Sequence, residues 1–263
     1  MGLDLKTAAA EIKKNIYEDD KLNAGALVFL WALLCLFIIN RMNSLLWAIA
    51  AGAIYYLSMV VFCIIFFKGI NKYLVFPKEN KKIPVFIGYK MDTLFVYPIL
   101  LVALTGVISN LLAVAGLVPT AVPLLKTAGN GFLMQFARLS LLPLAAYGEE
   151  ILNLLMVSFF YTNLKLSGNL RLACSIPAAA FAFGVLHVSG WGIPGAVSVG
   201  ISHIPLFLAT LYTGNIWISF LAHLYSNIIS MTKAWYGGSF VTATAVLAFI
   251  AAIWSARVQF RKS

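Results

Sequence analysis

Long apolar runs, separated by short polar connections, make up most of the chain. An α-helix of about 20 apolar residues is long enough to cross the hydrocarbon core of a bilayer. The runs of about this length or longer cover residues 24–40, 44–67, 93–117, 131–162, 170–188, 193–212, 214–231 and 240–256. This pattern predicts an all-α fold, a polytopic membrane helix bundle with about eight transmembrane helices.

Some segments depart from a simple succession of spans. The run at 131–162 is longer than a bilayer requires, so we expect it to tilt, to break near Pro143 or to begin as an interfacial segment. The first 23 residues mix acids with lysines, which favours a short surface helix over a secretory signal. A basic connection from Lys68 to Asp92 completes an N-terminal part, residues 1–92, and precedes a six-helix part, residues 93–263.

Composition and charge agree with a membrane protein. Hydrophobic residues make up 62% of the chain and charged residues only 11%, against roughly a quarter charged in soluble domains. On alternate sides of eight spans, fifteen Lys and Arg residues fall on the side of both termini and three on the other. Because cytoplasmic loops carry the excess of Lys and Arg, we expect both termini in the cytoplasm. The net charge of +10 then indicates contact with anionic lipid headgroups rather than with nucleic acid.

Ionisable side chains inside the apolar runs are few and grouped. Of the nine acidic residues, only Glu149 and Glu150 lie within a run, and the three histidines, His187, His203 and His223, follow them. Charged groups in hydrocarbon are costly, and their usual place is a functional site. The five side chains are therefore a candidate site.

Helical geometry brings several of these groups to one level. Neighbouring residues are about 100° apart around a helix, so one of Glu149 and Glu150 is expected to react and the other to support it or to be a partner for a neighbouring helix. His223 and Asn227 are four residues apart and share a helix face. Counted at about 1.5 Å per residue, Glu149, His187, His223 and Asn227 fall within a layer one or two helical turns thick.

These residue types suit hydrolysis. Cleavage of a peptide bond inside a membrane needs a base for water, a group that polarises the carbonyl and donors for the oxyanion. One carboxylate, two imidazoles and an amide supply all of these. Phe183 precedes His187 by four residues, so its ring is expected to pack beside the imidazole and to fix its orientation.

Three short motifs resemble those of a known family. "GEE" ending at Glu150, "FGVLH" ending at His187 and "HLYSN" from His223 to Asn227 are similar, in order and spacing, to the EExxxR, FxxxH and HxxxN motifs of the CAAX protease and bacteriocin-processing (CPBP) family. That family includes type II prenyl-protein endopeptidases and Abi proteins. The resemblance covers residues 130–231 and implies an intramembrane endopeptidase. It would make Glu149 and His187 the activators of water, with Glu150 in support, and His223 and Asn227 the oxyanion donors.

One position departs from the family pattern. The arginine of EExxxR is replaced by Leu154, and Arg138 is roughly 16 Å along the helix from Glu149, too far to substitute directly. Asn153 is a milder candidate for a hydrogen bond to a carboxylate. The missing arginine keeps open a catalytically inactive CPBP-like regulator or scaffold. A proton-coupled transporter, with the acids and histidines as a relay, is a further alternative.

No cofactor is certain from the sequence. Histidines with a carboxylate suit zinc, so Glu149, His187 and His223 are metal candidates. His203 matches no family motif, and a position near Pro205 favours a hydrogen bond to a freed backbone carbonyl, although it could join a zinc site.

The expected partners are a hydrophobic or membrane-bound peptide and the lipid bilayer, not nucleic acid. The lysine-rich chain shows no eukaryotic targeting signal, which favours a bacterial cell membrane. By the charge count Glu149 and His187 lie nearer the outer half of the membrane, whereas the resemblance to prenyl endopeptidases implies cytoplasmic access. A re-entrant segment between residues 118 and 145 would reverse the later helices.

Overall fold

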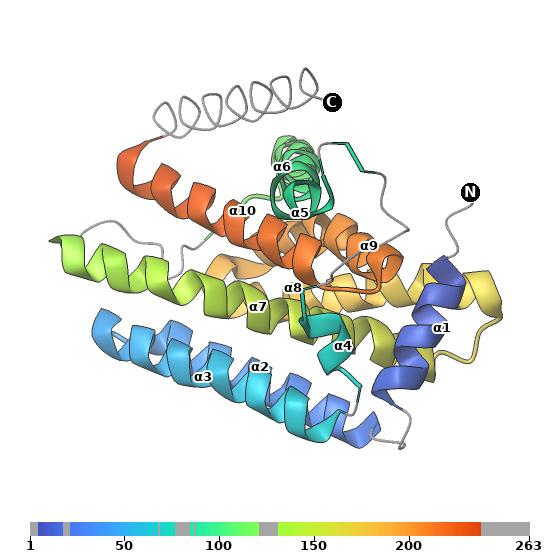
Figure 1. Cartoon of the computed structure of the whole chain (residues 1–263). Coiled ribbons are helices and arrows are strands. Elements are labelled where there is room, and N and C mark those ends of the chain that lie inside the picture. The colour runs from blue at the N-terminus through green and yellow to red at the C-terminus, as the bar shows by residue number, and fades with distance from the viewer. Residues whose placement is uncertain are drawn as a thin grey trace.

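A computed structural model describes residues 5–17, 22–67, 69–76, 85–86, 88–120 and 131–237. All regular secondary structure in these ranges is helical, which confirms the all-α prediction. The elements, shown in Figure 1, are α1 (Leu5–Ile16), α2 (Leu22–Arg41), α3 (Leu45–Phe66), α4 (Asn71–Leu74), α5 (Tyr89–Met91), the π-helical η1 (Asp92–Val96), α6 (Tyr97–Val114), α7 (Gly131–Asn163), α8 (Gly168–Ser202), α9 (Ile204–Thr213) and α10 (Trp217–Tyr236).

Within the described residues, five helical segments are long and apolar enough to cross a membrane, so the prediction of about eight spans is not confirmed. They are Asn23–Arg41, Leu45–Phe66, Tyr89–Val114, Gly131–Asn163 and Gly168–Thr213. The predicted spans 170–188 and 193–212 fall within the last of these, and 240–256 lies outside the described residues. The predicted span 214–231 corresponds to α10, which carries polar residues along one side and is therefore less apolar.

Helix α7 occupies the centre of the bundle. In Figure 1 it lies between the α2–α3 pair and α10, and its apolar window is 78% buried, against 11–28% for α2, α3 and the α6 segment. The helix continues through Pro143 as one element, so the predicted break is absent. Because the outer helices screen α7 from lipid, polar side chains on α7 can meet protein instead of hydrocarbon.

Helix α8 folds back on itself at Gly192, whose φ of 70° interrupts the helical backbone. The two halves then touch through glycines, since a Cβ added at Gly184 would lie 2.7 Å from the carbonyl oxygen of Ala196 and near Gly200. The second half ends at His203, and α9 begins with Pro205 in its first turn. This turn brings the histidines of α8 and of the α8–α9 junction to the same level.

The N-terminal helix α1 forms as the sequence predicts. Its apolar side chains, including Ile12 and Ile16, are buried, and the helix packs on α7 and α9. At the same end of the bundle, the Asn15 amide donates to the Tyr73 hydroxyl, and the Lys6 amine lies close to Gly168 at the α7–α8 connection.

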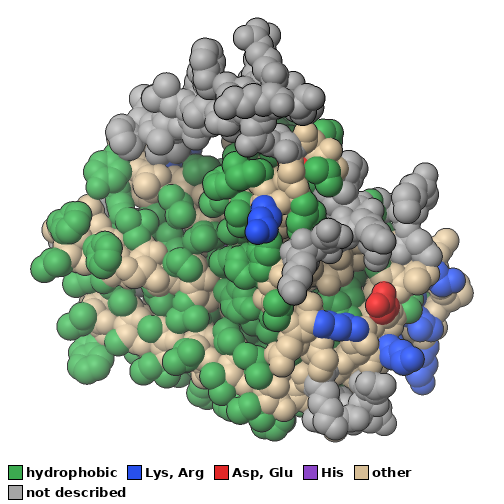
Figure 2. All heavy atoms as spheres, in the orientation of Figure 1, with side chains coloured by type: hydrophobic (Ala, Val, Ile, Leu, Met, Phe, Trp, Pro, Cys, Tyr) green, Lys and Arg blue, Asp and Glu red, His purple; other side chains and the backbone are tan. Residues whose placement is uncertain are grey.

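Basic residues gather at this end of the molecule. Figure 2 shows most of the Lys and Arg side chains of the viewed face beside α1, while the larger part of that face is hydrophobic. The tail, the segment after α3 and the α7–α8 connection thus lie together, as the alternation of predicted spans requires. One hydrophobic core joins α1, α2 and α3 to α7 and α8, across the predicted boundary at residue 92, and the division into two parts stays a prediction.

Candidate active site

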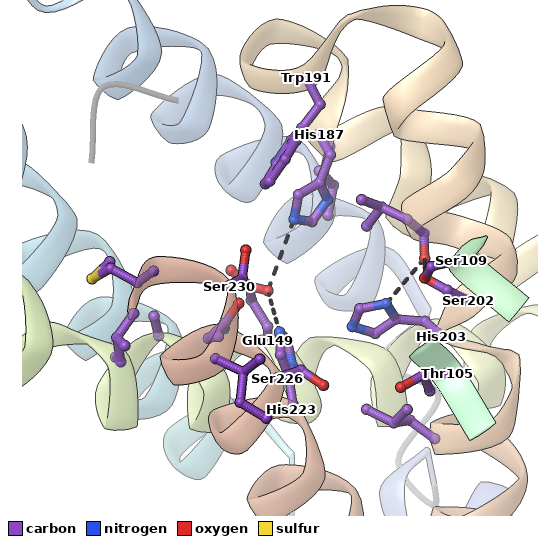
Figure 3. A pocket seen from close by; sticks show the side chains of 18 of the residues that line it. Thr105, Ser109, Glu149, His187, Trp191, Ser202, His203, His223, Ser226 and Ser230 are labelled. Carbon is purple, nitrogen blue, oxygen red and sulfur yellow. Dashed lines mark hydrogen bonds and ion pairs between the residues drawn. The ribbon is translucent and has the colours of Figure 1, made fainter. Parts of the chain in front are cut away.

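A cavity of about 570 Å³ lies among α2, α3, α6, α7, α8 and α10. Its wall includes Glu149, His187, His223 and Asn227, four of the five residues predicted to be catalytic, and also His203. Figure 3 shows Glu149, His187 and His223 pointing toward one another from three different helices. The predicted common level is confirmed for Glu149, His187 and His223, because Glu149 Oε2 lies within 3.9 Å of a ring nitrogen of each histidine.

The Glu149 carboxylate is held by three partners. The Tyr56 hydroxyl on α3 donates to Oε1 at 2.7 Å. Oε2 lies 3.4 Å from His223 Nε2 and 3.9 Å from His187 Nε2. The side chain is nearly buried, with 8% of the residue exposed. Glu149 thus presents one oxygen to two imidazoles, while a tyrosine fixes the other.

Tyr56 was missed by the reasoning from sequence. A single tyrosine within an apolar run on another helix gives no spacing signal, because membrane helices use tyrosine widely at their interfaces. Tyr56 reaches Glu149 because α3 packs against α7 beside Gly148, where an added Cβ would lie 3.2 Å from the Tyr56 ring. The position of Tyr56 in the second apolar run does not predict this packing.

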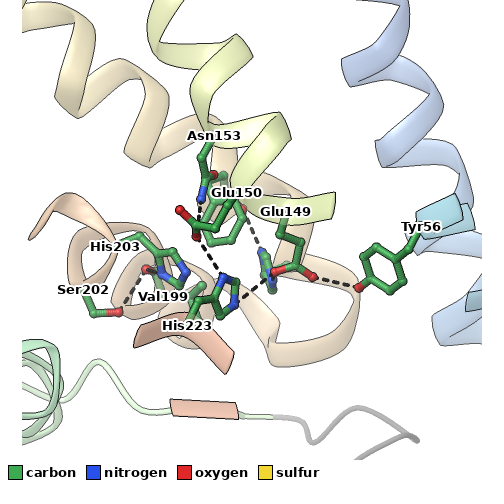
Figure 4. Close-up of polar contacts among 10 residues, drawn as sticks. Tyr56, Glu149, Glu150, Asn153, Val199, Ser202, His203 and His223 are labelled. Carbon is green, nitrogen blue, oxygen red and sulfur yellow. Dashed lines mark hydrogen bonds and ion pairs between the residues drawn. The ribbon is translucent and has the colours of Figure 1, made fainter. Parts of the chain in front are cut away.

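Glu150 points away from the cavity and supports His223. Its Oε1 is 2.9 Å from His223 Nδ1 and accepts a hydrogen bond from the Asn153 amide at 3.0 Å. The predicted hydrogen bond from Asn153 to a carboxylate is confirmed, and Glu150 is a partner for the neighbouring helix α10 through His223. Figure 4 shows the resulting chain from Tyr56 through Glu149, His223 and Glu150 to Asn153.

His223 therefore stands between two carboxylates, and 5% of it is exposed. A neutral imidazole has one N–H, whereas the protonated ring has two. Only the protonated ring can donate Nδ1–H to Glu150 and Nε2–H toward Glu149 at once. The two carboxylates thus lie one at each nitrogen of the His223 ring.

The tautomer of His187 follows from its partner. Nδ1 lies 2.9 Å from the carbonyl oxygen of Phe183. A carbonyl oxygen only accepts hydrogen bonds, so Nδ1 carries the hydrogen and, in the neutral ring, Nε2 is left as an acceptor facing Glu149. The Phe183 ring packs 4.6 Å from the imidazole, centroid to centroid, which confirms the predicted orienting contact.

His203 follows the same rule. Its Nδ1 lies 3.0 Å from the carbonyl oxygen of Val199, so a bond to a backbone carbonyl is present as predicted. This carbonyl also accepts the backbone N–H of His203, so it is not one freed by Pro205. The turn of α8 also sets its ring 4.8 Å from that of His223 and 4.2 Å from that of Phe183. The sequence signal for this approach is the "GWGIP" stretch at residues 190–194, which ends the first half of α8.

The remaining predicted residues lie apart from the carboxylates' direct contacts. Asn227 is half-buried on the cavity wall, one turn after His223 on α10. Leu154, in place of the family's arginine, is 2% exposed and packs in the hydrophobic core. Arg138 is 1% exposed on the cavity wall, and its guanidinium carbon lies 5.9 Å from the Trp235 ring centroid.

The residues that fit a metal best differ from those predicted. Among the described residues, Glu150, His203 and His223 offer ligand atoms that all lie within 4.8 Å of one another. Of the predicted zinc candidates, His223 belongs to this group together with His203, the possible further ligand, whereas Glu149 and His187 do not belong to it.

The carboxylate of Glu150 and the imidazoles of His203 and His223 are ligand types that suit zinc. Glu150 Oε2 has no hydrogen-bond partner within the described chain. Tetrahedral zinc sets neighbouring ligand atoms about 3.4 Å apart, so the three side chains fit after closing by at most about 1.4 Å.

The fold and the site define a class: an all-α protein of the membrane type, with a buried Glu–His cluster on the wall of an internal cavity. Comparisons with protein-family models, with curated proteins and with solved structures gave no match. The geometry of the Glu–His cluster is therefore the basis for a functional assignment.

Proposed function

We propose that this protein is an intramembrane endopeptidase of the CPBP type, which hydrolyses a peptide bond in a hydrophobic or membrane-associated peptide. The observation that supports it is the placement of Glu149 Oε2 at a cavity wall, 3.9 Å from His187 Nε2 and 3.4 Å from His223 Nε2. A carboxylate and an imidazole acceptor facing one space suit activation of water. A cationic imidazole and an amide on the adjacent α10 suit oxyanion stabilisation.

In this mechanism, water entering the cavity donates hydrogen bonds to Glu149 and to Nε2 of His187. Glu149 takes one proton as the water oxygen bonds to the carbonyl carbon and the π electrons move to the carbonyl oxygen. His223 Nε2–H and the Asn227 amide donate to that oxyanion. When the C–N bond breaks, Glu149 returns its proton to the leaving amine, so the enzyme ends in its starting state.

Each surrounding contact has a part in this mechanism. Tyr56 holds the unreactive oxygen of Glu149, so the carboxylate cannot rotate freely. The Phe183 carbonyl keeps the acceptor nitrogen of His187 toward the cavity. Glu150, held by Asn153, keeps His223 charged and oriented. Such preorganised groups lower the reorganisation needed at the moment of reaction.

A second candidate is metal-assisted hydrolysis, which the grouping of Glu150, His203 and His223 favours. A divalent ion held there would polarise the scissile carbonyl as a Lewis acid. Cleavage that persists after a chelator removes metal, and that is unchanged in His203→Ala, would exclude the metal mechanism and support the glutamate mechanism. Cleavage that is lost on chelation and restored by zinc would favour the metal mechanism.

The test of the proposal is cleavage of a library of quenched hydrophobic peptides by the purified protein in nanodiscs. We expect Glu149→Gln to lower cleavage at least about 100-fold, and His187→Ala and His223→Ala about 100-fold, as for other losses of general-base or oxyanion groups. Glu11→Gln on α1, which lies away from the cavity, is the matched control. Full activity in the Glu149 variant would exclude the mechanism, and proton flux without cleavage would favour the transporter.

Variants of two adjacent tyrosines, Tyr55 and Tyr56, extend the same cleavage test. Tyr56→Phe removes the hydrogen bond to Glu149 and should lower cleavage about 10-fold, the effect of roughly one hydrogen bond to a charged group. Tyr55 is equally buried, but its hydroxyl has no hydrogen-bond partner within the described chain. Tyr55→Phe should therefore leave cleavage unchanged, and equal losses in the two variants would contradict the assigned role of Tyr56.

A further inference from the structure

The cavity extends well beyond the Glu–His cluster. On α7 its wall residues, Arg138, Leu141, Leu142, Ala145 and Glu149, recur at the spacing of one helix face. On α10 the wall carries Ser226, Asn227 and Ser230 after His223 and reaches Lys233. The space between these helices therefore has an apolar wall and a polar wall.

Two contacts fix the two ends of this space. Glu149 meets His223 at one end, with 3.4 Å between Oε2 and Nε2. Arg138 meets Trp235 at the other, with 5.9 Å from the guanidinium carbon to the ring centroid. Going from the first contact to the second runs backward along α7 and forward along α10, so the helices are antiparallel. The rise of the helix makes the ends roughly 16 to 18 Å apart.

The far end is positively charged. Arg138 is 1% exposed, so its guanidinium does not reach the aqueous surface as a snorkelling arginine does. Lys233, whose side chain is exposed, lines the same cavity. Among the described wall residues Glu149 is the only carboxylate, and it lies at the opposite end. The far end of the described cavity wall is thus cationic, whereas the end at Glu149 carries the carboxylate.

We infer that Arg138, with Lys233, forms a subsite for a carboxylate of the peptide substrate, about five residues from the scissile bond. An extended chain covers about 3.3 Å per residue, so roughly 16 Å corresponds to five residues. The hydroxyl and amide groups of α10 suit the backbone of such a chain, and the leucines of α7 suit apolar side chains. The fork of the arginine side chain matches a carboxylate with two parallel hydrogen bonds. This inference rests on the proposed function for its register, but not for its charge preference.

Binding tests the charge preference without catalysis. The Glu149→Gln chain in phosphatidylcholine nanodiscs is titrated with a fluorescein-labelled apolar ten-residue peptide that has an amidated C-terminus and carries one Asp, or with its Asn counterpart. We expect the Asp peptide to bind at least 10-fold more tightly, and Arg138→Met to abolish the difference. Arg41→Met, at the end of α2 and outside the cavity wall, should keep it. Equal binding of the Asp and Asn peptides to the chain that retains Arg138, together with no preference for a free C-terminal carboxylate, overturns the subsite, whatever the variants do.

Two further arms identify the source of the charge. A peptide with a free C-terminal carboxylate and no Asp shows whether a chain end serves as well as a side chain; either preference supports the subsite. If peptide charge has no effect while phosphatidylglycerol in the nanodisc slows modification of the Arg138 pocket by phenylglyoxal, the subsite belongs to a lipid headgroup and the inference is wrong.

Cleavage by the chain with Glu149 intact tests the register. Moving the Asp by two residues along the peptide should move the cut by two residues in the same direction. A cut that stays in place contradicts the register. If no peptide is cut but the Asp preference in binding holds, the proposed function fails while the subsite stands.

Discussion

At the scale of the residue, the site is a series of side chains joined by hydrogen bonds and ion pairs, and each side chain orients its neighbour. Glu149 reaches the cavity because Tyr56 holds one of its oxygens and His223 faces the other. Glu150 points away from the cavity and orients His223 instead. Two adjacent glutamates therefore have different roles because the helix turns them apart, and the packing of neighbouring helices decides which of them meets the cavity.

Leu154 permits a test of the departure from the family pattern. It follows Glu150 by four residues, so an arginine there would lie one turn from Oε2, which has no hydrogen-bond partner within the described chain. We expect Leu154→Arg to be tolerated far better than Leu155→Arg, by about 2 kcal/mol or more, because an unpaired buried charge is strongly destabilising. Both leucines are 2% exposed, and the residue four before Leu155 is Ile151.

Thermal unfolding in detergent measures this difference. Replacing Glu150 by Gln in the Leu154→Arg chain should remove most of the advantage, since the partner of the new charge is lost. Equal loss of stability in Leu154→Arg and Leu155→Arg would show that the Glu150 carboxylate is not available to an arginine at that position.

At the scale of the element, the turn of α8 decides the composition of the site. The fold-back at Gly192 lets Phe183 contact the rings of both His187 and His203. The close approach of the two halves depends on Gly184 and Gly200, where a side chain would meet backbone atoms. A change at these glycines should therefore affect both stability and the position of the histidines.

Gly184→Ala is expected to destabilise the protein by about 1–3 kcal/mol, the usual cost of overpacking. Alanine normally favours a helix over glycine by up to about 1 kcal/mol. Gly106→Ala on α6 is the control, because a Cβ there meets nothing within 4 Å, and it should be neutral or stabilising. Thermal unfolding of the two variants is the measurement, and a Gly184→Ala chain as stable as the control would contradict the tight packing of the α8 halves.

The prediction from the sequence agrees best with the structure for residues of a type that is rare in apolar runs. Ionisable residues are so uncommon in apolar runs that Glu149, His187 and His223 stood out, and the period of the helix predicted their common level. The approach of His203 depends on the turn at Gly192, and the contact of Tyr56 depends on the packing of α3 on α7. Such contacts join distant segments, so neither spacing nor composition reveals them.

The predicted number of spans is not confirmed by the described residues, for a related reason. Helix α10 lines the cavity, and its polar residues His223, Ser226, Asn227 and Ser230 lower its hydropathy, although the helix itself was expected. The two predicted spans at 170–188 and 193–212 fall within one segment that turns on itself. A count of apolar runs treats every helix as a lipid-facing crossing, whereas a helix that lines a cavity also carries polar residues on its cavity side.

At the scale of the whole molecule, the bundle is polarised along its axis. The α1 helix, the segment after α3 and the α7–α8 connection contact one another at one end, through Asn15 with Tyr73 and Lys6 near Gly168. The α2–α3 connection, which contains Asn43, lies at the other end of those helices (Figure 1). Since positive segments remain on the cytoplasmic side, we expect the α1 end to face the cytoplasm.

Single cysteines in a chain without Cys35, Cys63 and Cys174 test this arrangement. A maleimide that cannot cross membranes should label Lys14→Cys and Ser167→Cys only in inverted vesicles, and Asn43→Cys only in right-side-out vesicles. All three positions are exposed. Labelling of the first two from opposite sides would contradict the fold, and labelling of both from the outside would reverse the orientation.

The gathering of separate basic segments at one end also affects how mutations are tolerated. Lys13 and Lys14 on α1, Lys72 on α4 and Arg171 near the start of α8 belong to three segments far apart in the sequence, and all three lie at this end. Each segment alone favours the same orientation during insertion. We therefore expect the loss of charge from one of these segments to leave the membrane orientation unchanged, because two segments still direct the chain. Glu149, in contrast, is the lone carboxylate among the described wall residues and has no substitute there.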